Sequence, residues 1–335
     1  MPKALVLLSG GLDSMLAAKL LLNQGVEVTG LTFTTPFFGA KKAEESAKQL
    51  GIDLKVIDIS KDHFKIVKKP PHGYGKNVNP CIDCHGLMFR KAKELIKKEG
   101  FDFVATGEVL GQRPMSQNKG ALKIVEKLAG LEGKILRPMS AKLLDETEVE
   151  QKGIVDRDKL LAIKGKSRKE QMALAKELGF KKYATPGGGC LLTDPGYAQR
   201  FKKLQKIFSP PSRGQAHFDL KEAELIKYGR LFVEQDYMFL VGREHEENLK
   251  LKKIADKNDI LLEVKEVPGP ITLLHFFRVT KQPVSAATKK IALKKAAGRT
   301  VRYANRGVRE FEEVGVVSLD NGEEIKIETG KIFNK

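Results

Sequence analysis

The sequence contains little cysteine and no long apolar segment. Three cysteines occur in 335 residues, and an odd number excludes a framework in which every cysteine is paired in a disulfide. In a reducing compartment, isolated cysteines tend to be catalytic or to bind metals. No apolar run is long enough to span a bilayer, and a predicted strand begins by residue 4 without a charged and apolar leader before it. We therefore expect a cytoplasmic protein without a membrane partner.

Acidic residues are too few to balance the basic ones. Lysine and arginine together number 60 against 42 aspartates and glutamates, which gives a formal net charge of +18. This excess indicates a polyanionic partner, although a lysine-rich solvated surface would give the same composition. Hydrophobic residues make up 41% of the chain, enough for buried cores, and the length favours two domains.

A glycine-rich turn joins the first predicted strand to the first predicted helix. The apolar run at residues 4–8 is typical of a strand buried on both faces, and apolar residues recur at helical spacing from Leu16 onward. Between them, Ser9-Gly10-Gly11-Leu12-Asp13-Ser14 sets glycines and hydroxyls at a helix N-terminus, which favours a bound phosphate. A tight strand-to-helix corner would use the same glycines. The turn lacks the Gly-Lys-Ser/Thr ending of a Walker loop, which argues against chemistry at a γ-phosphate.

Strand and helix patterns alternate through the first third of the chain. Strands are predicted at residues 26–33, 54–59 and 103–106, and helices at 41–50 and 87–98. This alternation predicts an α/β fold with a parallel sheet, helices on both faces and ligands at the carboxyl ends of the strands. At one such end, Gly107 would admit a nucleotide close to the backbone, and Gln112, Ser116 and Gln117 would offer amides and a hydroxyl.

Two motifs carry a resemblance to a known family. Ser-Gly-Gly-x-Asp-Ser after a first strand resembles the PP-loop of ATP pyrophosphatases, which cut ATP between the α and β phosphates. Ala-Thr-Gly-Glu-x-Leu-Gly-Gln at residues 105–112, with Ser116-Gln117 and residues 136–139 (Leu-Arg-Pro-Met), resembles the ThiI-type tRNA 4-thiouridine synthetases. The resemblance covers roughly residues 1–205. It implies an adenine nucleotide alpha hydrolase-like fold, ATP and Mg²⁺ as cofactors, and tRNA as partner.

The resemblance also implies roles for individual residues. Asp13 is the candidate for positioning the metal or the loop, with a helix-capping carboxylate as the alternative. Phe33 begins a stretch that would line the adenine pocket, or form an ordinary loop. The full set of expected ATP-binding residues is Leu8, Ser9, Gly10, Gly11, Leu12, Asp13, Ser14, Phe33, Thr106, Gly107, Gln112 and Gln117.

The cysteines have the spacing of metal ligands. Cys81 and Cys84 stand three residues apart at the predicted start of a helix, and Cys190 follows a Pro-Gly-Gly-Gly segment. Such thiols can share one metal centre. Four thiolates normally hold a 4Fe-4S cluster, so three would leave one iron open. Several tRNA thiolation enzymes of this superfamily, including tRNA 2-thiocytidine synthetases, have a similar arrangement and hold such a cluster, whose open iron is thought to carry sulfide.

Two other interpretations of the cysteines remain open. In a persulfide mechanism, Cys190 would carry the sulfur and a second cysteine would resolve it. In the second interpretation, the three cysteines and His85 hold a structural zinc ion.

The second half of the chain is predicted to be a separate domain. The domains are expected at residues 1–208 and 220–335, joined by a Pro-rich linker at 209–219. Short strands are predicted at 231–233, 237–241, 260–264 and 271–275. Val241-Gly242-Arg243 and the Asp-Lys-Asn-Asp and Pro-Gly-Pro segments that follow resemble the NFACT-type RNA-binding domain, so a smaller α+β domain is expected.

A basic segment gives independent support for an RNA partner. Residues 268–309 contain no Asp or Glu, and residues 285–297 are predicted to form a helix that ends at Gly298. One basic face suits a phosphate backbone. The expected RNA-binding residues are Arg278, Lys289, Lys290, Lys294, Lys295, Arg299, Arg302 and Arg306.

Together these features predict an ATP-dependent tRNA sulfurtransferase. A uracil carbonyl oxygen would attack the α-phosphorus of ATP, and sulfur at the centre formed by Cys81, Cys84 and Cys190 would displace AMP, with 4-thiouridine as the expected product. The catalytic candidates are these cysteines and Asp13. The sulfur donor would be free sulfide or a cysteine desulfurase, and the protein a monomer or homodimer. An amide-forming PP-loop ligase and a non-enzymatic RNA-binding factor are the alternative classes.

Overall fold

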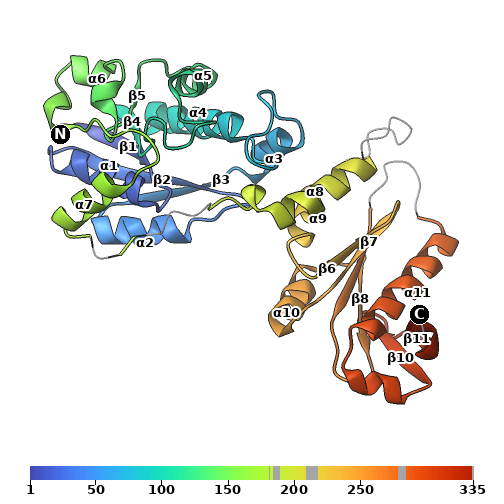
Figure 1. Cartoon of the computed structure of the whole chain (residues 1–335). Helices are drawn as coiled ribbons and strands as arrows, with labels where there is room; N and C mark the ends of the chain where they lie inside the picture. The colour runs from blue at the N-terminus through green and yellow to red at the C-terminus, as the bar shows by residue number, and fades with distance from the viewer. Residues whose placement is uncertain (181, 184–188, 209–217, 278–283, 334–335) are drawn as a thin grey trace. The chain divides into compact units, whose positions relative to one another are not determined.

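The computed structural model describes residues 1–180, 182–183, 189–208, 218–277 and 284–333. The chain forms two compact units, Met1–Asp194 (unit 1) and Pro195–Lys335 (unit 2), each with its own sheet (Figure 1). Within the described ranges, no helix combines the length and apolar character needed to cross a bilayer.

Unit 1 contains a five-stranded parallel sheet in the order β3-β2-β1-β4-β5. Its strands are β1 (Lys3–Leu7), β2 (Glu27–Thr34), β3 (Leu54–Asp58), β4 (Phe103–Thr106) and β5 (Ile135–Leu136). Its α-helices are α1 (Leu12–Leu22), α2 (Lys41–Leu50), α3 (Ser60–Lys68), α4 (Cys81–Glu99), α5 (Lys119–Ala129), α6 (Glu148–Gln151) and α7 (Lys169–Glu177). Figure 1 shows the helices on both sides of the sheet.

Alternating residues of each strand are buried on opposite faces of this sheet. Leu5 of β1 packs in a core with residues of α4 and α5. Its neighbours Ala4 and Val6 pack in a second core with residues of α1 and α6. Because both faces are covered, the strands are continuous apolar runs. The predicted fold class is confirmed.

Unit 2 contains a six-stranded sheet in the order β11-β10-β8-β9-β7-β6, in which each neighbouring pair is antiparallel. Its strands are β6 (Arg230–Val233), β7 (Tyr237–Val241), β8 (Asp259–Val264), β9 (Thr272–Phe276), β10 (Glu313–Ser318) and β11 (Glu324–Glu328). Its α-helices are α8 (Pro195–Phe208), α9 (Leu220–Leu225), α10 (His245–Ile254), α11 (Ala286–Arg302) and α12 (Gly330–Phe333). Residues of α11 share a core with one face of the sheet.

Helix α8 belongs to unit 2, whereas the sequence analysis placed residues 195–208 in the first domain. The Tyr197 hydroxyl donates to the Ala223 carbonyl at 2.9 Å. The Arg200 guanidinium donates to the carbonyls of Ile226 and Gly229 at 2.9 and 2.8 Å. These bonds hold α8 against the segment that leads into β6. Of the predicted linker, residues 209–217 lie outside the described residues.

The prediction that the basic helix ends at Gly298 is wrong. Helix α11 continues through Gly298 to Arg302. Gly298 is buried, and a Cβ atom there would lie 3.2 Å from Cδ1 of Ile332. The glycine therefore serves close packing against α12 and not a helix cap, a difference that sequence alone does not reveal.

A buried charged cluster ties α9 to the sheet of unit 2. His275 Nδ1 lies 2.6 Å from Asp259 Oδ1, and its Nε2 lies 3.1 Å from Glu222 Oε1. Lys221 Nζ lies 2.9 Å from the other oxygen of Asp259. Burial alone would lower the pKa of His275, but hydrogen bonds and charge from both carboxylates outweigh it and raise that pKa to about 9. The imidazole is therefore a cation at neutral pH.

This cluster predicts an alkaline loss of stability. The pKa of His275 rises from an ordinary value near 6.5 to about 9 on folding, so its contribution is fully present below pH 6.5 and is lost as the pH passes about 9. Chemical denaturation should show that His275→Gln removes up to about 3 kcal/mol of unfolding free energy at pH 6.5 and much less at pH 10. The exposed His245 provides the control, His245→Gln. Equal destabilisation by His275→Gln at both pH values would contradict the assignment.

Candidate nucleotide and thiol site

The PP-loop forms the tight corner between β1 and α1. The Ser14 hydroxyl donates to the Gly11 carbonyl at 2.8 Å, and the Gly11 amide donates to Ser9 Oγ at 3.3 Å. Gly10 has a φ of +78°, and a Cβ there would lie 2.4 Å from the carbonyl carbon of Lys42 at the start of α2. Because the first amides of a helix lack intrahelical partners, this corner presents donors suited to a phosphate.

The end of β4 touches the first turn of α1. A Cβ at Gly107 would lie 2.4 Å from the Ser14 amide nitrogen and 2.5 Å from the Asp13 carbonyl carbon. Those atoms belong to a helix backbone and cannot move aside as a flexible side chain would. Gly107 is therefore required for the β4 loop to approach the PP-loop, whereas the sequence analysis assigned this glycine to the approach of a nucleotide.

Asp13 pairs with an arginine from far along the chain. Arg168 caps the N-terminus of α7, and its Nη2 lies 3.2 Å from Asp13 Oδ2. The other oxygen, Asp13 Oδ1, and the Arg168 Nε are buried and have no hydrogen-bond partner among the described residues. Unpaired buried polar atoms are costly. This pair therefore offers a carboxylate oxygen suited to Mg²⁺ and a guanidinium suited to phosphate.

The loop after β4 holds the two predicted glutamines. The Gly111 amide donates to the Gln117 carbonyl at 2.7 Å, which closes the loop. Gln112 Nε2 and Gln117 Oε1 are buried and unpartnered among the described residues. This leaves one donor and one acceptor open in a loop whose first residue, Gly107, contacts the PP-loop.

The remaining predicted nucleotide ligands have buried side chains. Leu8, Leu12 and Phe33 lie in apolar cores, and Thr106 is 6% exposed. These residues could therefore meet a nucleotide chiefly through backbone atoms.

The three cysteines converge at the N-terminus of α4. Cys81 begins the helix, and the Cys84 amide donates to the Pro80 carbonyl at 2.9 Å. Cys190 is brought to this end by the segment that follows it. Leu192 accepts a bond from the Val78 amide at 3.3 Å, and Thr193 accepts one from Asn77 Nδ2 at 2.7 Å. These bonds join the Cys190 segment to the loop directly before Cys81.

The thiols are free; Cys84 is buried, whereas Cys81 and Cys190 are half-buried, and the three are near enough for charge on one to act on another. Burial raises the pKa of Cys84 well above its ordinary value, and charge on Cys190 and Cys81 acts in the same direction. Burial raises the pKa of Cys190 to about 12 although the Leu192 amide and Arg113 oppose the rise. Burial also raises the pKa of Cys81 against Arg113. Without a cation between them, the three thiols are therefore neutral at pH 7.

The donor set of this site consists of three thiols. Its three sulfurs come from two segments, and the sequence contains no fourth cysteine. Within the described part of the chain, no group of three or more His, Cys, Asp and Glu side chains is arranged to hold a metal ion. A bound cation would reverse the pKa shifts, because a coordinating thiol is deprotonated. His85 turns its Nδ1 toward Glu108, so it does not join the thiols through that nitrogen.

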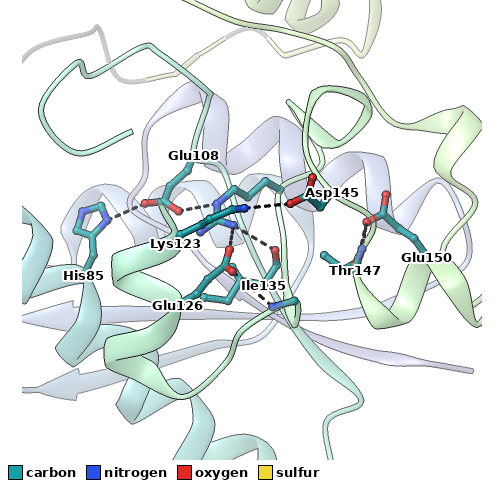
Figure 2. Close-up of polar contacts among 10 residues, drawn as sticks. His85, Glu108, Lys123, Glu126, Ile135, Asp145, Thr147 and Glu150 are labelled. Atoms are coloured by element: carbon teal, nitrogen blue, oxygen red, sulfur yellow. Dashed lines mark hydrogen bonds and ion pairs between the residues drawn. The ribbon is translucent and has the colours of Figure 1, made fainter. Parts of the chain in front are cut away.

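A buried ionic network links the thiols to the β4 loop. His85, directly after Cys84, has its Nδ1 2.8 Å from Glu108 Oε1 (Figure 2). Arg137 Nε donates to the other Glu108 oxygen at 3.1 Å, and Arg137 Nη1 donates to Glu126 at 2.5 Å. Burial would raise the pKa of Glu108, but Arg137 and His85 outweigh it and lower that pKa to about 2. Glu108 is therefore an anion. It follows Gly107 in the β4 loop and ties that loop to the N-terminus of α4.

Sequence reasoning missed the partners that complete these contacts. Arg168 stands at a helix N-terminus, where a cation is unfavourable unless it has an anionic partner. That position could therefore have indicated that Arg168 pairs with a carboxylate. Glu108 and Arg137 lay within the recognised motifs without an assigned role. Their pairing joins positions 29 residues apart along the chain, which no local pattern predicts.

The expected RNA-binding residues lie on unit 2, except that Arg278 falls outside the described residues. Lys289, Lys290 and Lys294 are exposed on α11 and have no ion pair within the part of unit 2 that the structure describes. Lys295 pairs with Glu234 at 2.9 Å. The remaining three, Arg299 and Arg302 on α11 and Arg306 beyond it, are exposed.

The fold and loop geometry define unit 1 as an α/β domain of the PP-loop type. The family model described as "Thiamine biosynthesis protein (ThiI)" matches residues 1–151. The tRNA-specific 2-thiouridylase MnmA of Sulfurimonas denitrificans is 36% identical over 118 residues, which is 32% of this chain and 35% of that protein. A probable tRNA sulfurtransferase of Methanosarcina mazei is 33% identical over 120 residues, 33% of this chain and 29% of that protein.

The matched regions span about a third of the length of these curated relatives. Among solved structures, a 4-thiouridine synthetase in complex with RNA and ATP is 21% identical, with a TM-score of 0.33, over 55% of this chain and 54% of that one. A TM-score of 0.33 is too low to support any conclusion about this chain.

The close approach at Gly107 predicts the effect of one added methyl group. Gly107→Ala should weaken ATP binding at least tenfold in isothermal titration, because its Cβ would displace the first turn of α1. Gly39→Ala is the matched control, since nothing lies within 4 Å of a Cβ there, and it should bind ATP as the wild type does. Wild-type affinity in folded Gly107→Ala protein would contradict the role given to this contact.

Proposed function

We propose that this protein is an ATP-dependent tRNA sulfurtransferase that converts a uridine to 4-thiouridine. The observation that carries the proposal is the convergence of Cys81, Cys84 and Cys190 at the N-terminus of α4, which the His85–Glu108 contact joins to the loop that touches the PP-loop. The relatives named as tRNA sulfurtransferase and 2-thiouridylase support the same class of reaction. The name of the 2-thiouridylase gives position 2 and that of the sulfurtransferase gives no position, so the experiment below identifies the product directly.

The PP-loop would hold the phosphates of ATP. Its helix-terminal amides and the Arg168 guanidinium would neutralise charge on the α-phosphate and the departing pyrophosphate. Asp13 Oδ1, buried and unpartnered among the described residues, would take Mg²⁺. The uridine O4 attacks the α-phosphorus and pyrophosphate leaves, so the oxygen becomes part of an adenylate. A sulfur nucleophile then adds at C4, and AMP departs with the former carbonyl oxygen.

The proposal assigns the thiols to a metal centre, with a persulfide carried on Cys190 as the alternative. Burial raises the pKa of Cys190 to about 12, so this thiol is neutral unless a bound cation displaces its proton. Cys81, Cys84 and Cys190 would hold a 4Fe-4S cluster, which, when bound, supplies an open iron for sulfide. The protein's own part is to exclude water around these thiols and to keep them beside the activated base.

Unit 2 would bind the tRNA through the exposed cations of α11. Its lysines face solvent in a segment of the sequence without acidic residues, and such a surface attracts a phosphate backbone. The sulfur would come from free sulfide or a cysteine desulfurase.

Loss of the Cys190 thiol should abolish thiolation of tRNA and leave tRNA binding intact. Purified anaerobically, the wild type should contain iron and sulfide near four each per chain, and Cys190→Ser should lose most of both. The variant should bind tRNA with unchanged affinity but form no thiouridine, as judged by mass spectrometry of digested tRNA. Chromatography would distinguish 4-thiouridine from 2-thiouridine. Thiolation by Cys190→Ser at the wild-type rate would overturn the proposal.

The arginine beside Asp13 should matter to the adenylation step. Arg168→Ala should reduce tRNA-dependent pyrophosphate release about a hundredfold, a loss typical of one donor to developing charge. Its exposed neighbour offers the control Lys169→Ala, with little expected change. Equal rates for the two variants would exclude Arg168 from phosphate binding.

A further inference from the structure

Three side-chain pairs connect β6 and α11, counting the residue directly after each element, Glu234 and Tyr303, and are here called the β6–α11 ladder. Arg230 Cζ lies 4.4 Å from the ring centroid of Tyr303. Arg299 Cζ lies 5.0 Å from the ring centroid of Phe232. In the third pair, Lys295 Nζ lies 2.9 Å from Glu234 Oε1. Two of the three pairs therefore stack a guanidinium on an aromatic ring.

The spacing of the ladder follows from the periods of its two elements. Residues 230, 232 and 234 alternate along the strand direction, so their side chains share one face. Residues 303, 299 and 295 are four apart, so they share one stripe of the helix. The two elements run in opposite directions, with steps of about 6 Å along the helix and just under 7 Å along the strand. Consecutive bases of an extended polynucleotide are separated by a similar step.

The central pair is the outer layer of a stack anchored in the core. Phe232 and Phe239 face each other across β6 and β7, with ring centroids 4.8 Å apart and an interplanar angle of 14°. Phe239 is buried, whereas Arg299 is exposed. The order Phe239, Phe232, Arg299 thus ends in a planar cation at the surface, over the ring of Phe232.

The neighbouring pair also presents a planar group to solvent. Tyr303 keeps 37% of its surface exposed next to Arg230. Strand β6 lies at the edge of its sheet, so the first two pairs of the ladder are not covered by another strand among the described residues. The third pair differs, because the Glu234 carboxylate would repel a phosphate and so marks one end of the usable surface.

We propose that the β6–α11 ladder binds a single-stranded segment of RNA, whose successive bases stack on Arg299 and Tyr303. The proposal rests on the RNA-binding role proposed for unit 2 and names the form of RNA that this surface takes. Unpaired bases stack on guanidinium planes and aromatic rings, whereas the bases of a duplex are already stacked on one another. Exposed lysines on α11, such as Lys294, would hold the phosphates of the same strand.

Two conservative changes test the stacking directly in the full-length chain. Arg299→Lys keeps the charge and removes the plane, and Tyr303→Leu keeps an apolar side chain and removes the ring. Fluorescence anisotropy with a short labelled RNA free of secondary structure should show affinity reduced about fivefold by Arg299→Lys and about tenfold by Tyr303→Leu. The salt dependence of binding should be unchanged, because no charge is lost.

Arg309→Lys is the matched control, since Arg309 Cζ also lies over a phenylalanine ring, 4.8 Å from the centroid of Phe333. It should change affinity less than twofold, and none of the three variants should alter binding of a duplex of the same sequence. Equal losses on single-stranded and duplex RNA would overturn the ladder proposal, as would Arg299→Lys and Tyr303→Leu proteins that bind like Arg309→Lys. If the wild type binds neither RNA, the RNA-binding role of unit 2 fails as well.

Discussion

The contact between the end of β4 and the first turn of α1 is the constraint on which the candidate site depends. Only a hydrogen at Gly107 fits against the Ser14 amide, so the β4 loop lies directly on the PP-loop. Glu108 follows in sequence and is held as a buried anion by Arg137 and His85. His85 in turn follows Cys84. One short path of covalent and ionic links therefore fixes the thiols relative to the nucleotide corner.

This arrangement separates phosphate binding from the chemistry of the thiols, two tasks that would interfere with each other. Phosphate donors belong to the α1 terminus, where backbone amides and Arg168 supply positive character. The thiols lie in an environment dry enough to raise their pKa values. A charged Glu108 between these regions is tolerated because the Arg137 guanidinium and the His85 imidazole both hydrogen-bond to its carboxylate. The chain thereby links an anion-binding corner to a cluster of partly buried thiols through one paired carboxylate.

Much of unit 1 was readable from the sequence, because its signals are local. Buried parallel strands give apolar runs, a PP-loop gives adjacent glycines, and α2 and β4 begin and end at the predicted residues. What escaped prediction depends on long-range packing: the Asp13–Arg168 pair joins residues 155 positions apart, and α8 packs within unit 2. Gly298 shows the same limit in unit 2, since a buried glycine in mid-helix and a capping glycine look identical until the packing partner is known.

The central claim is that the nucleotide corner and the thiols act on one uridine. It is tested most directly with tRNA whose uridine O4 is labelled with ¹⁸O, incubated anaerobically with the protein, ATP and sulfide. Mass spectrometry should find one ¹⁸O in AMP for each thiouridine formed, because the carbonyl oxygen leaves on the α-phosphate. Thiouridine formation with the label released into water or pyrophosphate, and none in AMP, would contradict the account.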